Sequence, residues 1–171
     1  MDLLVAPVNE VYRNLSGETG TVGISYFRSW EGELLDALAR SRVDDVRTGI
    51  AQVGPQRDDL SIFLAGRPAR SCGSQGEQRC LALALRLGLH RVAASENLCA
   101  GGDRIRPSGT PVPDPPILLL DDVFSELDPH RSAALAASLP GGQVFISAAG
   151  ELPPDLAAAT TITVSGGRIH Q

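Results

Sequence analysis

An unbroken apolar run that ends in two carboxylates does most to limit the folds open to this chain. Residues 117–120 read Ile-Leu-Leu-Leu, and Asp121 and Asp122 follow directly. A continuous apolar run is typical of a strand buried on both faces, as in a parallel sheet covered by helices. In open α/β sheets, ligands bind beyond the carboxyl ends of such strands. The run therefore predicts an α/β fold with a candidate site at its acidic end.

The other predicted elements support this fold class. The apolar spacing predicts helices at residues 2–15, 31–46 and 129–139, strands at 21–27, 60–64 and 144–147, and hairpins at 60–70 and 160–170. Leu and Ala alternate over residues 74–91, which alone would suggest a strand, but both are good helix formers and the run is long for a strand, so we expect a buried helix there. Residues 93–116 are rich in proline and glycine, which predicts a long flexible loop. Strands and helices alternate in the second half, and this order favours a mostly parallel sheet flanked by helices.

Composition narrows the class of protein further. The chain has 171 residues, 43% of them hydrophobic, and a net charge of −5, which suits one globular domain. No apolar run is long enough to cross a bilayer and no secretory signal opens the chain, so we expect no membrane partner. The three cysteines are odd in number and lack the spacing of a zinc site, which predicts free thiols in a reducing cytoplasm. All 15 basic residues are arginine, which excludes a mechanism that needs an ammonium group from this chain.

The two aspartates suit phosphate chemistry with a metal ion. A carboxylate at Asp121 is a ligand type that Mg²⁺ prefers. Successive side chains leave a strand in opposite directions, so Asp122 is expected to point elsewhere and to orient a water for attack on phosphorus. The alternative is a strand that stops at a polar turn, and the run alone leaves both interpretations open.

Two helix starts carry local signals. Ser74 and Glu77 have the spacing of a capping box, and the apolar helix follows directly. The free N–H groups and the dipole of such a helix start can bind a phosphate, although a capped core helix without a ligand is the alternative. Asp128 before Pro129 is a favoured N-cap, which requires no function.

Three stretches together resemble one family. They read Gly-Pro-Gln-Arg-Asp-Asp-Leu at residues 54–60, Ser-Gln-Gly-Glu-Gln-Arg at 74–79, and Leu-Leu-Leu-Asp-Asp-Val-Phe-Ser-Glu-Leu-Asp at 118–128. The combination is similar to the C-terminal part of an ABC-type ATPase head, and above all to the RecF family of bacterial DNA replication and repair proteins, related to the SMC ATPases. The resemblance implies that residues 50–171 form the C-terminal part of the head and that residues 1–49 are a remnant of a helical arm domain.

The resemblance implies a role for each matching position. Asp121 corresponds to the Walker B acid that holds Mg²⁺, and Asp122 to the residue that polarises the attacking water. The signature motif, which contacts the γ-phosphate of ATP on the opposite subunit, matches Ser74, Gln75, Gly76 and Glu77. The D-loop, which crosses the same dimer interface, matches Ser125, Glu126, Leu127 and Asp128.

The resemblance also implies cofactors and partners. ATP and Mg²⁺ are expected between the two subunits of an ATP-dependent homodimer. The expected partners are DNA at single-strand–double-strand junctions and recombination mediator proteins, in repair, recombination and the SOS response. The composition adds little support for DNA binding, because the net charge is negative and the arginines form no basic stripe.

The chain also departs from the family pattern. It has no G-x-x-x-x-G-K-[ST] loop, whose backbone and lysine position the phosphates in phosphoryl transfer. We therefore expect a fragment that is inactive alone and shares its ATP site with a missing N-terminal half or an opposing subunit. Gln56 replaces the usual histidine of the family, and the strand ending at Ser147 offers no switch histidine.

Two other interpretations stay open at this stage. An SMC-like or transporter-type ABC head fragment would carry similar motifs, although a transporter head more often has Asp-Glu-Pro after its strand. A non-catalytic interaction module would keep the fold without the chemistry. Mixing the chain with a candidate N-terminal half separates these interpretations, because only complementation restores ATP-dependent dimerisation.

Overall fold

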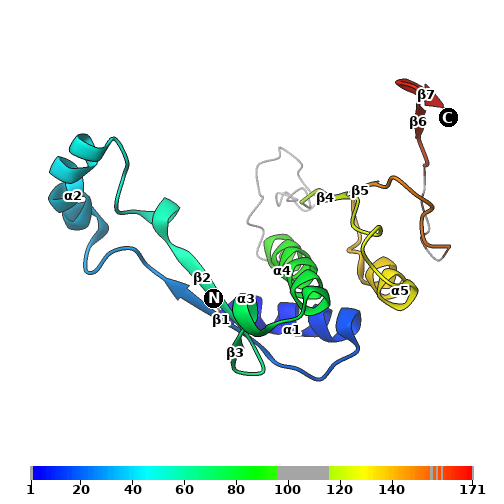
Figure 1. Cartoon of the computed structure of the whole chain (residues 1–171), viewed down its shortest axis with the longest axis horizontal. Helices are drawn as coiled ribbons and strands as arrows, with labels where there is room; N and C mark the ends of the chain where they lie inside the picture. Colours follow the sequence, from blue (N-terminus) through cyan, green and yellow to red (C-terminus); the bar gives the residue numbers. More distant parts are fainter. Residues whose placement is uncertain (1, 96–115, 155, 157, 159, 171) are drawn as a thin grey trace, which may run out of the picture. The chain divides into compact units, whose positions relative to one another are not determined.

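The computed structural model describes residues 2–95, 116–154, 156, 158 and 160–170 (Figure 1). The chain divides into two compact units, the first formed by residues 1–13 and 17–92, the second by residues 14–16 and 93–171. The expected loop at 93–116 begins too early, because a helix continues to Ser95, and most of that loop lies outside the described residues.

The core of the first unit lies between two long helices, α1 (Asp2–Ser16) and α4 (Gln75–Ser95). Residues on one face of α1, including Val8 and Val11, are fully buried, and so is Ala84 of α4. The helices approach closely at Gly88, where an added Cβ would lie 2.6 Å from a methyl carbon of Val8. The Leu/Ala alternation of residues 74–91 therefore forms the predicted buried helix, and not a strand.

A three-stranded antiparallel sheet extends from this core in the order β1 (Val22–Phe27), β2 (Asp59–Leu64), β3 (Arg67–Pro68). Its register pairs Val22 with Leu64 and Tyr26 with Leu60. The first pair is buried, whereas Tyr26 and Leu60 are 46% and 44% exposed. The expected strand at 67–70 is wrong in its second half, because the short helix α3 (Ala69–Cys72) begins there.

The far end of this sheet carries the helix α2 (Leu34–Thr48) and the 3₁₀ turn η1 (Pro55–Arg57). The α2 helix ends at Gly49, whose φ of 69° requires the left-handed conformation that glycine adopts without strain. Leu35 and Val46 on α2 are 80% and 78% exposed. Helical spacing alone did not show that α2 has so little burial.

The second unit contains the parallel pair β4 (Leu118–Asp121) and β5 (Val144–Ser147), connected through α5 (Pro129–Ser138). A hairpin follows, formed by β6 (Thr163–Ser165) and β7 (Arg168–His170). The α/β class is confirmed. In the described residues the parallel pairing is confined to β4 and β5, whereas the other paired strands are antiparallel.

One expectation about β4 is wrong. The apolar run predicted a strand buried on both faces, but burial alternates along β4. Leu118 and Leu120 are buried, whereas Leu119 is 66% exposed and its neighbour Phe145 on β5 is 53% exposed. One face of this parallel pair is therefore uncovered. Separately, no helix in the described part of the chain is long and apolar enough to span a membrane.

Candidate nucleotide site

Asp121 is the last residue of β4, and it lies beside the last residue of β5. The parallel register pairs Asp121 with Ser147, and both side chains are exposed. The hydroxyl of Ser147 donates a hydrogen bond to Oδ1 of Asp121. Because side chains alternate along a strand, this polar pair shares a face with the uncovered pair Leu119 and Phe145.

Asp122 lies beyond the strand, in a turn. Its φ of 47° is left-handed, which is uncommon for a residue other than glycine, although aspartate tolerates it better than most. Its N–H donates to the backbone oxygen of Ser147 at 3.0 Å and to the Ser147 hydroxyl at 3.2 Å. Its Oδ1 accepts a hydrogen bond from the N–H of Ala149 at 3.4 Å. The turn, and not strand alternation, therefore gives Asp122 its own direction.

The segment after Asp122 is held by hydrogen bonds over short sequence distances. The hydroxyl of Ser125 donates to the backbone oxygen of Asp122 at 2.9 Å. Asp128 is the N-cap of α5, as predicted, and its Oδ1 accepts from the N–H of Arg131 at 2.9 Å. This hydrogen bond, together with the charge of the Arg131 side chain, holds the pKa of Asp128 below its ordinary value of 3.8. The carboxylate of Asp128 is therefore engaged in a structural cap.

The end of the β4–β5 pair opens onto a groove of about 330 Å³. The groove is lined by Leu119, Leu120, Asp121, Phe145, Ile146 and Ser147. Mg²⁺ takes hard oxygen ligands and commonly keeps several waters while it is held by one or two carboxylates and substrate phosphates. A carboxylate and a hydroxyl at the open rim fit that requirement. No group of three or more histidine, cysteine, aspartate or glutamate side chains that could form an all-protein metal cage is present in the described residues.

The start of α4 has the predicted capping box. The N–H of Glu77 donates to the Ser74 hydroxyl at 3.2 Å, and the N–H of Ser74 donates to Oε2 of Glu77 at 2.7 Å. Gln75 and Gly76 form the first turn of the helix between them. Gln78, which sequence reasoning did not select, donates from its amide to the backbone oxygen of Gly73 at 2.9 Å. The helix start is thus closed by its own side chains.

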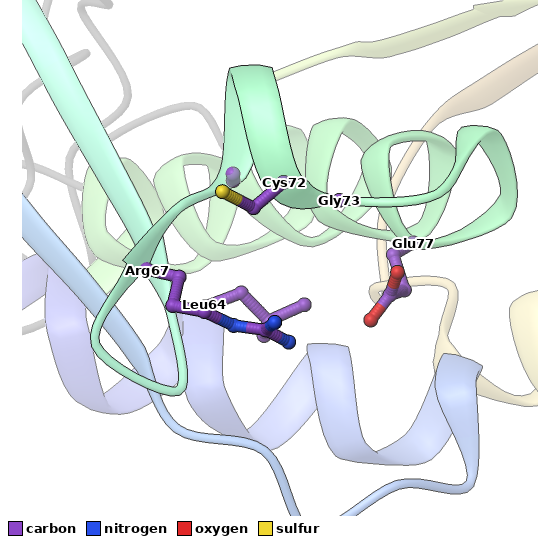
Figure 2. Close-up of a pocket in the computed structure, with 6 residues that line it drawn as sticks. Leu64, Arg67, Cys72, Gly73 and Glu77 are labelled. Atoms are coloured by element: carbon purple, nitrogen blue, oxygen red, sulfur yellow. The ribbon is translucent and has the colours of Figure 1, made fainter.

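A small cavity adjoins this helix start. Figure 2 shows Leu64 and Arg67 on the hairpin side and Cys72, Gly73 and Glu77 on the helical side. Its volume is about 10 Å³, close to the minimum for a single water molecule. It therefore offers no room for a nucleotide.

The Gly-Pro-Gln-Arg-Asp stretch has a structural role that its sequence did not reveal. Asp58 accepts hydrogen bonds from the Tyr26 hydroxyl and from the N–H of Ser29, the latter at 2.9 Å. The Ser29 hydroxyl also bonds both the N–H and the oxygen of Gly54 at 3.0 Å. These contacts join residues 25 or more positions apart along the chain, so sequence spacing gave no signal for them.

The α/β fold is that of the C-terminal part of an ABC-type ATPase head. A solved structure of the recombination mediator protein RecF with ATP, from the RecFOR pathway, matches 99% of this chain and 44% of its own length at 25% identity and a TM-score of 0.63. The corresponding structure with ATPrS has a TM-score of 0.61 at 24% identity, over 98% of this chain and 43% of its own. No protein-family model matches the chain.

The curated relatives identify the family. The DNA replication and repair protein RecF of Streptomyces avermitilis is 36% identical over 100% of this chain and 46% of its own length. RecF of Geobacter sulfurreducens is 39% identical over 82% of this chain and 38% of its own length. The chain belongs to the RecF family and corresponds to its C-terminal part. It spans less than half the length of these relatives.

Proposed function

We propose that this chain supplies the C-terminal part of a RecF-type ATPase head in DNA replication and repair, with residues 50–171 in the head and residues 1–49 in an arm domain. The observation that carries the proposal is the hydrogen-bonded pair of Asp121 and Ser147 at the end of a parallel strand pair, in a chain 36% identical over its whole length to a RecF protein. Strand ends of this kind are where α/β sheets bind ligands.

In this proposal the acidic strand end acts on the metal and on water. Asp121 would hold hydrated Mg²⁺, and its Oδ1 accepts a hydrogen bond from Ser147. Bound Mg²⁺ would neutralise the negative charge on the phosphates during phosphoryl transfer. Asp122, directed by its left-handed turn, orients the attacking water. Ser125 bonds the backbone of Asp122 and so couples the D-loop to this turn.

The start of α4 acts on the phosphate. Ser74, Gln75, Gly76 and Glu77 form a closed first turn. The backbone N–H groups and positive dipole end of such a turn favour an anion, which in this proposal is the γ-phosphate of ATP bound to the opposing subunit. Ser125 and Asp128 of the D-loop face the same nucleotide-dependent dimer interface. DNA at single-strand–double-strand junctions and recombination mediator proteins are the proposed partners, in the cytoplasm.

The missing phosphate loop gives the proposal a direct test. Since the chain has no lysine, we expect it neither to bind ATP tightly nor to hydrolyse it alone. The chain is mixed with the N-terminal part of S. avermitilis RecF that it does not match, and ATP hydrolysis and particle mass are measured. We expect ATP-dependent dimerisation and hydrolysis in the mixture, and loss of hydrolysis with Asp121→Ala.

Asp44→Ala is the matched control, because Asp44 is an exposed aspartate of α2 that forms a salt bridge of 2.9 Å with Arg47, one turn further along the helix. Turnover by the chain alone that disappears with Asp121→Ala would overturn the fragment interpretation. A mixture that assembles but ignores nucleotide would instead favour a non-catalytic interaction module.

A further inference from the structure

The hydroxyl of Ser147 lies between the two aspartates and bonds both. A serine hydroxyl has one hydrogen to donate and two lone pairs that accept. Here it donates to Oδ1 of Asp121 and accepts the N–H of Asp122 at 3.2 Å. One side-chain oxygen of β5 thus connects the side chain of one aspartate to the backbone of the next.

These contacts matter because the strand end is exposed. An exposed aspartate side chain is ordinarily free to change rotamer, and holding it in one conformation needs a specific partner. The backbone of Asp122 is left-handed, and it is held by the N–H bond to Ser147 and by the Ser125 hydroxyl at 2.9 Å. Ser147 is therefore placed to fix the orientation of Asp121 and to secure the turn that directs Asp122.

We propose that Ser147 is a positioning residue of the magnesium–nucleotide site. Its hydroxyl donates to Oδ1 of Asp121 and holds the carboxylate in one rotamer, in which the carboxylate would be oriented to take a hydrated ion. This inference rests on the proposed function. It adds a residue to which the motif comparison assigned no role, because the switch histidine of other ATPases has no counterpart at this strand end.

The chemistry limits which residues can replace serine. Alanine neither donates nor accepts through its side chain, so it would free Asp121 and leave the Asp122 N–H with only the backbone oxygen of residue 147. Threonine keeps the hydroxyl and suits a strand. A merely structural surface serine would tolerate either change with little effect.

The test uses the 171-residue chain without nucleotide and Mn²⁺ as the probe. The rotamer of Asp121 is measured from its side-chain couplings by NMR, and Mn²⁺ binding from the broadening of the Asp121 and Asp122 signals. We expect one Asp121 rotamer in the native chain, averaged rotamers in Ser147→Ala, and about tenfold weaker Mn²⁺ binding, as when an outer partner of a metal ligand is removed. Ser147→Thr should restore both. Ser165→Ala, an exposed strand serine of β6, is the matched control.

The two proposals fail in different ways. Averaged Asp121 couplings in the native chain, or equal couplings in Ser147→Ala, overturn the role of Ser147, and the first of these needs no variant to fold. A native chain with one fixed Asp121 rotamer that does not bind Mn²⁺ overturns the proposed metal function. Failure of Ser147→Thr to restore Mn²⁺ binding overturns the requirement for a hydroxyl.

Discussion

The start of α4 and the end of β4 both carry polar motifs, but they are completed in different ways. The side chains of Ser74 and Glu77, three residues apart, each accept a hydrogen bond from the backbone N–H of the other residue. Asp121 instead finds its partner in Ser147, 26 residues away on another strand. A motif completed locally stabilises its own helix with or without a ligand. A motif completed across the sheet has its side chains aligned only when the fold is formed.

Because of this difference, we expect the two motifs to contribute unequally to the stability of the fold. The capping box contributes to folding because it satisfies N–H groups that a helix start leaves open. The carboxylate of Asp121 is exposed, so its substitution is expected to change the free energy of unfolding little. We therefore expect substitutions at the two places to differ in their effect on the free energy of unfolding, which should fall at the start of α4 and change little at the end of β4.

The largest expected effect is that of Asp121→Asn on hydrolysis. Asparagine keeps the shape of the side chain and an oxygen for the Ser147 hydroxyl, but it lacks the charge that holds Mg²⁺. In the mixture with the N-terminal part of S. avermitilis RecF, we expect ATP hydrolysis to fall by about 100-fold or more, as for removal of one transition-state contact. The free energy of unfolding, measured with urea, should change by less than about 0.5 kcal/mol.

A large loss of stability in Asp121→Asn would contradict the difference between the start of α4 and the end of β4, because it would show that the strand end has a structural role. Asp44→Asn serves as the control for loss of one exposed carboxylate, and we expect it to leave both measurements unchanged. Unchanged hydrolysis in Asp121→Asn would contradict the metal role itself.

The second expected effect is that of Ser74→Ala on the chain without nucleotide. Loss of the cap removes the hydroxyl that accepts the Glu77 N–H, which costs about 1 kcal/mol of unfolding free energy. Urea unfolding followed by circular dichroism measures this loss, and Ser74→Thr should retain most of the stability. Glu77→Ala removes the acceptor of the reciprocal bond, and the double variant should lose less stability than the sum of the two single losses.

If Ser74→Ala leaves stability unchanged while it removes hydrolysis in the mixture, then the helix start is maintained for the phosphate and not for the fold. That result would reverse the contrast drawn between α4 and β4.

The same contrast explains what the sequence could predict. The helix of residues 74–91, the strand 144–147 and the caps at Ser74 and Asp128 follow from local spacing and propensity, and each is present in the structure. The predicted strand 117–120 lies within one residue of β4, but the predicted burial on both faces is wrong. A continuous apolar run is the same whether both faces are covered or, as at Leu119, one face is open.

The site itself was predictable only in part. The acidic end of the apolar run indicates Asp121 and Asp122, but strand alternation does not apply to Asp122, which lies beyond β4 in a left-handed conformation that periodicity cannot predict. The sequence shows only that the strand ending at Ser147 offers no switch histidine, because the contact of Ser147 with Asp121 depends on the parallel register. The Asp58 contacts with Tyr26 and Ser29 were missed for the same reason, because partners distant in the chain leave no local pattern.

The smallest expected effect concerns pH and the cap of α5. Since the pKa of Asp128 is lowered in the folded chain, its ionised form contributes stability above the ordinary value of 3.8, and this contribution is lost as the pH falls through the folded-state pKa. Asp128→Asn keeps a good N-cap but does not titrate. The native chain should therefore be the more stable of the two at neutral pH, and the difference in unfolding free energy should shrink with acidification. Asp59→Asn, at the exposed start of β2, controls for loss of a carboxylate. If the difference in unfolding free energy stays constant with pH, the charge of Asp128 does not contribute to the cap. Asp128 would then stabilise α5 through its hydrogen bond alone, as Ser74 stabilises α4.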